Sequence, residues 1–269
     1  MRRAACYGGL VLLGLGTIAG AAFGYYRLDV YVDGQVSARR PEAAVEFVNL
    51  PEPVAAFAGS DLRDSLSNLF ARNWTDQDLC RDIAQRLSSS AWVAQVHYVR
   101  RGGSGRFEIN ARYRVPKAMV QQDHLYVLVD TEGVRVPGVY PDSTEWKAIY
   151  GVARAAPPPG ELWEGEDLKA GLSLLAILEA EPFRGQIKGV LVENHAGRRD
   201  PRATHITLVT DRTGGRIRWG SAPGFEMEEN IVPQKLALLR ENYGRTGRAD
   251  ADHTQIDVST FPDRYTVPG

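Results

Sequence analysis

The sequence has few cysteines and no excess of charge of either sign. Its 269 residues include two cysteines, Cys6 and Cys80, and 32 basic residues stand against 33 acidic ones. Cys6 falls in an N-terminal apolar run and Cys80 far downstream, so we expect no disulfide and a fold held together by apolar burial. The balance of charge argues against a nucleic-acid partner, because proteins that bind nucleic acids need a basic surface to neutralise phosphates.

The sequence also lacks the residue spacings that mark metal sites and nucleophiles. No histidine pair has metal-ligand spacing among the five present: His97, His124, His195, His205 and His253. Ser221 lies in Gly-Ser-Ala-Pro-Gly, but a nucleophile elbow needs glycine two residues earlier, where Trp219 stands. The Arg-Arg-Gly-Gly-Ser-Gly stretch from Arg100 lacks the Lys-Ser/Thr ending of a P-loop, so we interpret it as a hairpin turn.

Acidic residues fall mostly where they satisfy the backbone. They lie in turns or at the start of an expected helix, where a carboxylate accepts backbone N–H groups or complements the helix dipole: Asp130, Glu132, Glu164, Glu166 and Asp167. A pair of acids on separate elements, as glycoside hydrolysis needs, stays open. We therefore expect no enzymatic activity, cofactor, metal or small-molecule substrate. The alternative is an exported or membrane-anchored enzyme that acts on the cell wall.

What the sequence does contain is one long uncharged run, from Ala4 to Tyr26, with Arg2 and Arg3 before it. About 20 apolar helical residues cross a bilayer, and the arginine pair favours a cytoplasmic N-terminus. We predict a short tail and transmembrane helix over residues 1–26, a single pass through the cytoplasmic membrane and a body on the periplasmic side. The alternative is a signal peptide cleaved after Ala19-Gly20-Ala21.

Small residues recur along one side of the predicted anchor. Gly16, Gly20 and Gly24 come at every fourth position, which is the pattern of a face through which two membrane helices pack closely. Residues 27–43 are polar and carry no periodic apolar face, so we interpret them as a stalk. The sequence predicts an α+β body beyond the stalk.

Residues 44–117 have the pattern of a small domain with a strand, two helices and two strands. Proline brackets a first strand over 44–50, and the first helix is expected to begin at Ser60 or Asp61. The second helix follows Thr75, with a buried stripe of Leu79, Ile83 and Leu87. The strands over 91–99 and 106–115 form a hairpin, and we expect Trp92 to be buried against the helices.

Residues 118–265 predict a larger mixed β domain with two helices. Strands are expected from Leu125, over 187–193, 205–210 and 216–219, and finally over 254–261. The helices are expected over 167–181, where Pro182 ends the pattern, and from Pro233 to Tyr243.

The order of these elements outside one membrane anchor resembles the FtsQ/DivIB family of bacterial cell-division proteins. Residues 44–117 are similar to the POTRA domain of that family, in which a Trp-Val pair opens the hairpin, as Trp92-Val93 does here. The family's Arg-x-Pro-x-Ala pattern at the end of the returning strand is matched from Arg114 to Ala118. The second block resembles the family's β domain through Trp219-Gly220, Lys235-Leu236 and Ile256-Asp257-Val258, among other pieces.

The resemblance implies a non-enzymatic scaffold that recruits other membrane-anchored division proteins, FtsB- or DivIC-like and FtsL-like, through its exported domains. A POTRA-bearing secretion component is less well supported, because no membrane barrel pattern follows. The family binds its small bitopic partner at the C-terminal face of the β domain.

The last predicted strand, from Thr254 to Phe261, would lie at a sheet edge, where a partner strand can add through main-chain hydrogen bonds. We assign this role to eight residues: Gln255, Ile256, Asp257, Val258, Ser259, Thr260, Phe261 and Tyr265. Proline at Ser259 is expected to block capture of the partner if the Ser259 N–H faces outward. The alternative is that this strand only completes the sheet.

Overall fold

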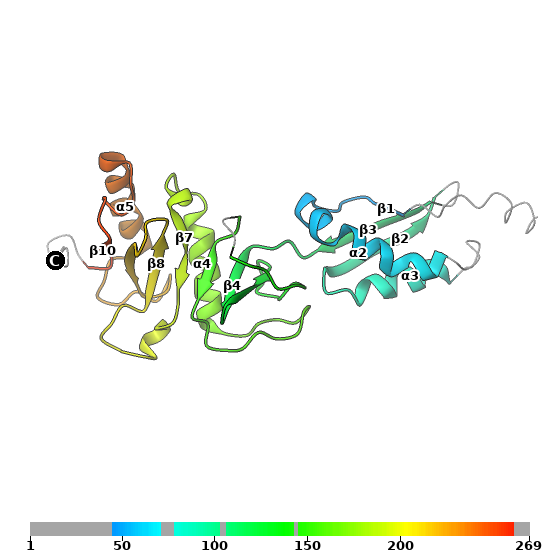
Figure 1. The fold of residues 1–269 in the computed structure, drawn as a ribbon, viewed down its shortest axis with the longest axis horizontal. Coiled ribbons are helices and arrows are strands. Elements are labelled where there is room, and N and C mark those ends of the chain that lie inside the picture. The colour runs from blue at the N-terminus through cyan, green and yellow to red at the C-terminus, as the bar shows by residue number, and fades with distance from the viewer. Residues whose placement is uncertain (1–44, 71–77, 103–105, 143–144, 261–269) are drawn as a thin grey trace, which may run out of the picture.

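The chain folds into an α+β structure with two sheets and four helices in the residues described, which confirms the predicted class. The computed structural model describes residues 45–70, 78–102, 106–142 and 145–260. The N-terminal sheet and its helices lie at one end of the long axis, and α5 with β10 lies at the other (Figure 1). In chain order the elements are β1 (Val45–Phe47), α2 (Glu52–Phe70), α3 (Leu79–Ser88), β2 (Val93–Arg101), β3 (Phe107–Tyr113), β4 (Ala118–Gln122), β5 (Leu125–Val129), β6 (Ala148–Tyr150), α4 (Glu166–Leu178), the 3₁₀ turn η2 (Arg184–Gln186), β7 (Ile187–Leu191), the 3₁₀ turn η3 (His195–Gly197), β8 (Ile206–Thr210), β9 (Arg216–Gly220), α5 (Val232–Thr246) and β10 (Gln255–Asp257).

The N-terminal sheet has the order β1-β3-β2, with β1 parallel and β2 antiparallel to β3. The predicted α3 stripe of Leu79, Ile83 and Leu87 is fully buried, and Trp92 packs in the same core with 5% of its surface exposed. Both predictions are confirmed. Burying each such leucine or isoleucine contributes about 1.5–3 kcal/mol, so the helices are held mainly by this apolar face.

The predicted start of the first helix was wrong. α2 begins at Glu52, not at Ser60 or Asp61, and continues to Phe70. Pro53 lies in the first turn, where a missing N–H costs no helical hydrogen bond. Ser60 and Asp61 are exposed in mid-helix, next to the buried Leu62.

The second sheet has seven strands in the order β10-β9-β8-β7-β6-β4-β5. Its registers align a continuous row of buried apolar side chains across five strands: Ile149, Val190, Leu208, Ile217 and Ile256. α4 and α5 pack in the same core cluster as this row. α4 approaches β6 so closely that a Cβ added to Gly171 would lie 3.0 Å from Ile149 Cγ2.

Aromatic contacts and ion pairs join the two sheets. The Phe57 ring of α2 lies 5.2 Å from that of Trp146, two residues before β6. Arg112 pairs with Glu132 at 2.6 Å, and Arg114 pairs with Asp130 at 3.0 Å. These contacts connect β3 to the turn that follows β5.

The predicted anchor, the stalk and the glycine face (Gly16, Gly20 and Gly24) lie outside the residues described. Among the helices that are described, none combines the length and the apolar character needed to span a bilayer.

Candidate functional site

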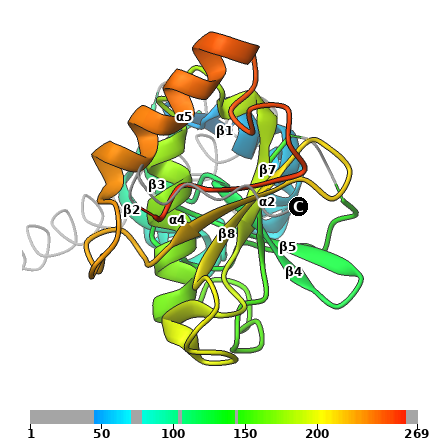
Figure 2. The ribbon, with the colours of Figure 1, turned by 90° about the vertical axis from the view of Figure 1, so that its left-hand side faces the viewer.

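The two ends of the seven-stranded sheet differ. At one end, β5 is covered by the chain that follows it, because isolated bridges join Tyr126 to Tyr140 and Val129 to Arg135. At the other end, β10 is the last strand, and among the described residues it pairs only with β9. Figure 2 looks onto this end, with β10 in front and α5 to one side. β10 is therefore an open edge, which is the property on which strand addition depends.

The register of β10 shows which backbone groups face outward. β10 runs parallel to β9, with Ile256 opposite Ile217; Arg216 N–H donates to Thr254 O at 2.8 Å, and Val258 N–H donates to Arg218 O at 3.1 Å. Because ladder bonds alternate along a strand, Ile256 faces β9, while the N–H and C=O groups of Gln255 and Asp257 point away from it. The Ile256 side chain is fully buried in the core.

The edge strand is shorter than the sequence predicts. After Asp257 the backbone carbonyls are hydrogen-bonded to the buried Asn230. Asn230 N–H donates to Ser259 O at 2.8 Å, and Asn230 Nδ2 donates to Val258 O at 3.0 Å and Thr260 O at 2.5 Å. Asn230 is 1% exposed. These bonds occupy the carbonyls of residues 258–260, which are thus unavailable to an added strand.

The condition for the Ser259 proline test, an N–H that is free to face a partner, is not met. Both the N–H and the hydroxyl of Ser259 donate to Asp257 Oδ1, at 2.9 and 2.6 Å. This short side-chain turn competes with the sheet ladder. Of the eight residues assigned to the edge, Gln255, Ile256 and Asp257 form β10, while Phe261 and Tyr265 lie outside the described residues.

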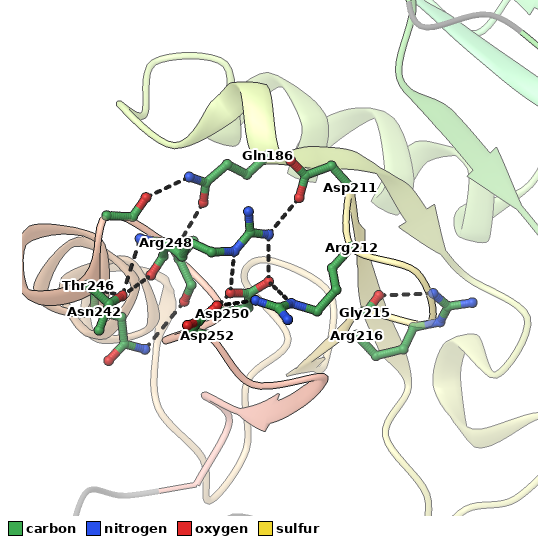
Figure 3. A network of polar contacts seen from close by, with 12 residues as sticks. Gln186, Asp211, Arg212, Gly215, Arg216, Asn242, Thr246, Arg248, Asp250 and Asp252 are labelled. Atoms are coloured by element: carbon green, nitrogen blue, oxygen red, sulfur yellow. Dashed lines mark hydrogen bonds and ion pairs between the residues drawn. The ribbon is translucent and has the colours of Figure 1, made fainter.

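A polar network holds the connection from α5 to β10 (Figure 3). Arg248 binds the buried Asp250 through two nitrogens, at 2.9 and 2.8 Å, and Asp211 at 2.6 Å. These two carboxylates raise the pKa of Arg248, Asp250 more than Asp211. Burial alone would raise the pKa of Asp250, but the hydrogen bond from Arg248 holds it below its ordinary value. Gln186 binds both Gly247 O and Ala249 N, so the connection is tied to η2 as well.

A buried lysine holds the loop between β9 and α5, which carries Asn230. Lys235 of α5 is fully buried, with Nζ 2.9 Å from Glu229 Oε1 and 5.0 Å from the centre of the Trp219 ring. Glu229 Oε1 also accepts Ser221 N–H at 2.8 Å. The Lys235–Glu229 pair thus ties this loop both to α5 and to the end of β9. Sequence reasoning missed Asn230, Glu229 and the burial of Lys235, because no spacing or local pattern indicates them.

Exposed apolar side chains lie on the same loop. Phe225 is 74% exposed and Met227 is 84% exposed, and both line a groove of about 620 Å³ beside α4. Clusters of this kind often mark interaction surfaces. His195, His205 and Ser221 line the groove too. No hydrogen bond joins Ser221 to either ring among the described residues, so the groove shows no assembled nucleophile and base.

The predicted role of acidic side chains as acceptors for backbone N–H groups is confirmed for Asp130 and Asp167. Asp130 Oδ1 accepts the N–H groups of Glu132 and Val134, each at 2.9 Å. Asp167 is buried; one oxygen accepts Leu168 N–H and the other binds Arg198 at 2.5 Å. Burial alone would raise the pKa of Asp167, but Arg198 and the backbone amides hold it below its usual value. These carboxylates organise the backbone.

No protein-family model matches the chain, and no curated protein matches it significantly.

Proposed function

We propose that the protein is a membrane-anchored scaffold of the bacterial division complex, with no catalytic activity, that captures a partner strand at β10. The outer side of β10 carries this proposal, because among the described residues no strand pairs with it, whereas bridges from the following chain join β5 at the other end of the sheet. Gln255 and Asp257 offer main-chain donors and acceptors to an added strand. Phe225 and Met227 are exposed on the loop that also carries Asn230, and they would give the partner an apolar contact.

The N-terminal unit supports the same proposal. The order β1-α2-α3-β2-β3, with a parallel β1/β3 pair and an antiparallel β2/β3 pair, fits the POTRA domain that the sequence resembles. Its own long edge strand, β2, is a poorer site for strand addition, because it contains two register shifts and carries Arg100 and Arg101. Bulges and charges protect an edge against pairing.

The remaining features of the proposal rest on the sequence. Residues 1–26 form the anchor, residues 27–43 the stalk, and the body lies on the periplasmic side of the cytoplasmic membrane. The partners are membrane proteins of the division complex, FtsB- or DivIC-like and FtsL-like. Gly16, Gly20 and Gly24 are the face of the anchor that pairs with a second helix.

Depletion of the protein, with imaging of cell shape, tests the proposed role. A scaffold of the division complex predicts filaments that fail to divide. Normal division with an altered wall composition would instead favour a wall-acting enzyme and overturn the proposal.

A proline substitution tests the surface. The Gln255 N–H points away from β9, so Gln255→Pro removes an outward donor and leaves the ladder with β9 intact. We expect Gln255→Pro to melt at the wild-type temperature and to lose partner capture, whereas the matched Gln255→Ala retains capture because its N–H is kept. Equal capture by both folded variants would place the partner elsewhere.

A further inference from the structure

A second site is suggested by the cleft between the two sheets, far from β10. The cleft has a volume of about 810 Å³ and is lined by the ends of β3 and α4, by the segments that follow β5 and precede β6, and by η2. Leu175, Leu178 and Ile187 give it an apolar floor, with Trp146 beside them. A volume of this size and a mixture of apolar and polar lining are typical of ligand sites.

The charged groups of the cleft do not balance. Three cations are matched by carboxylates within the cleft, in the pairs Arg112–Glu132, Arg114–Asp130 and Lys117–Glu179. Lys147 and Arg184 also line it, and among the described residues neither forms an ion pair. The remaining carboxylate of the lining, Glu145, already has a contact of its own. Among the described residues, therefore, two cations of the lining have no carboxylate within ion-pair distance, and Asp211 acts on Lys147 only from farther away.

Lys147 is the more constrained of the two cations. It is partly buried directly before β6, and burial lowers its pKa against a smaller opposite effect of Asp211, which means that the ammonium is incompletely solvated. An anion placed in the cleft would restore the lost stabilisation of this charge.

Arg184 is the more accessible of the two cations. It is exposed in η2 and lines the cleft, so its guanidinium offers several N–H donors to an anion there.

We propose that this cleft binds an oxyanion, a carboxylate or a phosphate, carried by an apolar body. The oxyanion lies between Lys147 and Arg184, and the apolar body lies on Leu175, Leu178 and Ile187. The site joins the N-terminal unit to the seven-stranded sheet, so its occupation links the two. The inference is independent of the proposed scaffold role, because it does not involve β10.

Titration of the full-length protein tests the site, with chemical shifts of the cleft residues as the readout. The probes are N-acetyl-leucine as a carboxylate, phenyl phosphate as a phosphate, and N-acetyl-leucinamide as the uncharged match of the first. We expect at least one oxyanion to bind about tenfold more tightly than the amide, the effect of one charge-assisted hydrogen bond. The oxyanion that binds more tightly shows whether the site takes a carboxylate or a phosphate.

Two variants locate the bound oxyanion. Lys147→Gln and Arg184→Gln each remove one unpaired charge of the lining and leave a polar side chain in its place. We expect both to weaken binding of the oxyanion several-fold without lowering the melting temperature. Lys188→Gln, at an exposed site on β7, serves as the control and leaves binding unchanged. Equal binding of the amide and both oxyanions, or full binding in the double variant Lys147→Gln/Arg184→Gln, would overturn the proposal.

Discussion

Replacing Asn230 tests how the end of the edge strand is held. The side-chain amide donates to Val258 O at 3.0 Å and Thr260 O at 2.5 Å, from a position that is 1% exposed. Each hydrogen bond of this kind contributes about 0.5–1.5 kcal/mol net, so Asn230→Ala is expected to cost about 1–3 kcal/mol. The backbone bond from Asn230 N–H to Ser259 O remains in the variant.

Asn230→Asp sharpens the test, because it keeps the shape and reverses the polarity. A carboxylate oxygen would then face two carbonyl oxygens in a buried site, so we expect a larger loss, of about 3–5 kcal/mol, as for other unpaired buried charges. Near-isosteric replacement rules out lost packing as the cause.

Urea unfolding followed by tryptophan fluorescence measures both losses, because Trp219 lies in the core beside β10. A lower midpoint at an unchanged slope reports stability alone. Native-state hydrogen exchange adds a local readout, in which the Val258 amide should exchange faster in Asn230→Ala. If Asn230→Ala and Asn230→Asp both unfold at the wild-type midpoint, the side chain of Asn230 does not hold residues 258–260 in place.

Three further predictions follow from buried groups elsewhere in the fold. Trp92→Ala empties a buried aromatic site and should cost about 3–5 kcal/mol in urea unfolding; an undetectable shift would refute the packing described. Lys235→Met strands Glu229 without its buried partner and should cost about 3–5 kcal/mol, with part of the loss recovered when Glu229→Gln is added; no recovery would mean the pair is not coupled. The pKa of Asp167 is lower in the folded protein than in the unfolded chain, so its stabilisation is complete above about pH 5 and is lost as the pH falls through the folded value. Arg198→Ala should reduce that acid-dependent loss in melting experiments, and an unchanged pH profile would contradict the assigned role.

The spacing of apolar residues, together with the prolines and glycines between segments, predicted much of the fold. The stripe of α3 and the proline after α4 gave these helices close to their observed bounds, and the glycine-rich turn gave the β2/β3 hairpin. The start of α2 was misplaced because Ser60 and Asp61 look like caps, while the actual start at Glu52, with Pro53 in the first turn, leaves only a weak local signal. β4 was not predicted as a separate strand, because its sequence, Ala-Met-Val-Gln-Gln, does not alternate.

The candidate site was predictable only in part. The position of β10 at an edge follows from chain order and was expected, but strand order and parallel pairing are set by contacts between distant segments. The clamp by Asn230 and the buried Lys235 depend on side chains that meet only after folding. A lysine in a helix is usually exposed, and its sequence neighbours do not reveal the Glu229 and Trp219 that make its burial tolerable.

Hydrogen exchange of the Gln255 and Asp257 amides, with and without the captured partner, tests the central claim most directly. In the protein alone these N–H groups point away from β9 and should exchange rapidly, while the inward amides of Ile256 and Val258 are protected. Addition of a partner strand predicts strong protection of the outward-facing amides in the complex. If the partner is bound and both outward amides still exchange as rapidly as in the free protein, strand addition at β10 is contradicted.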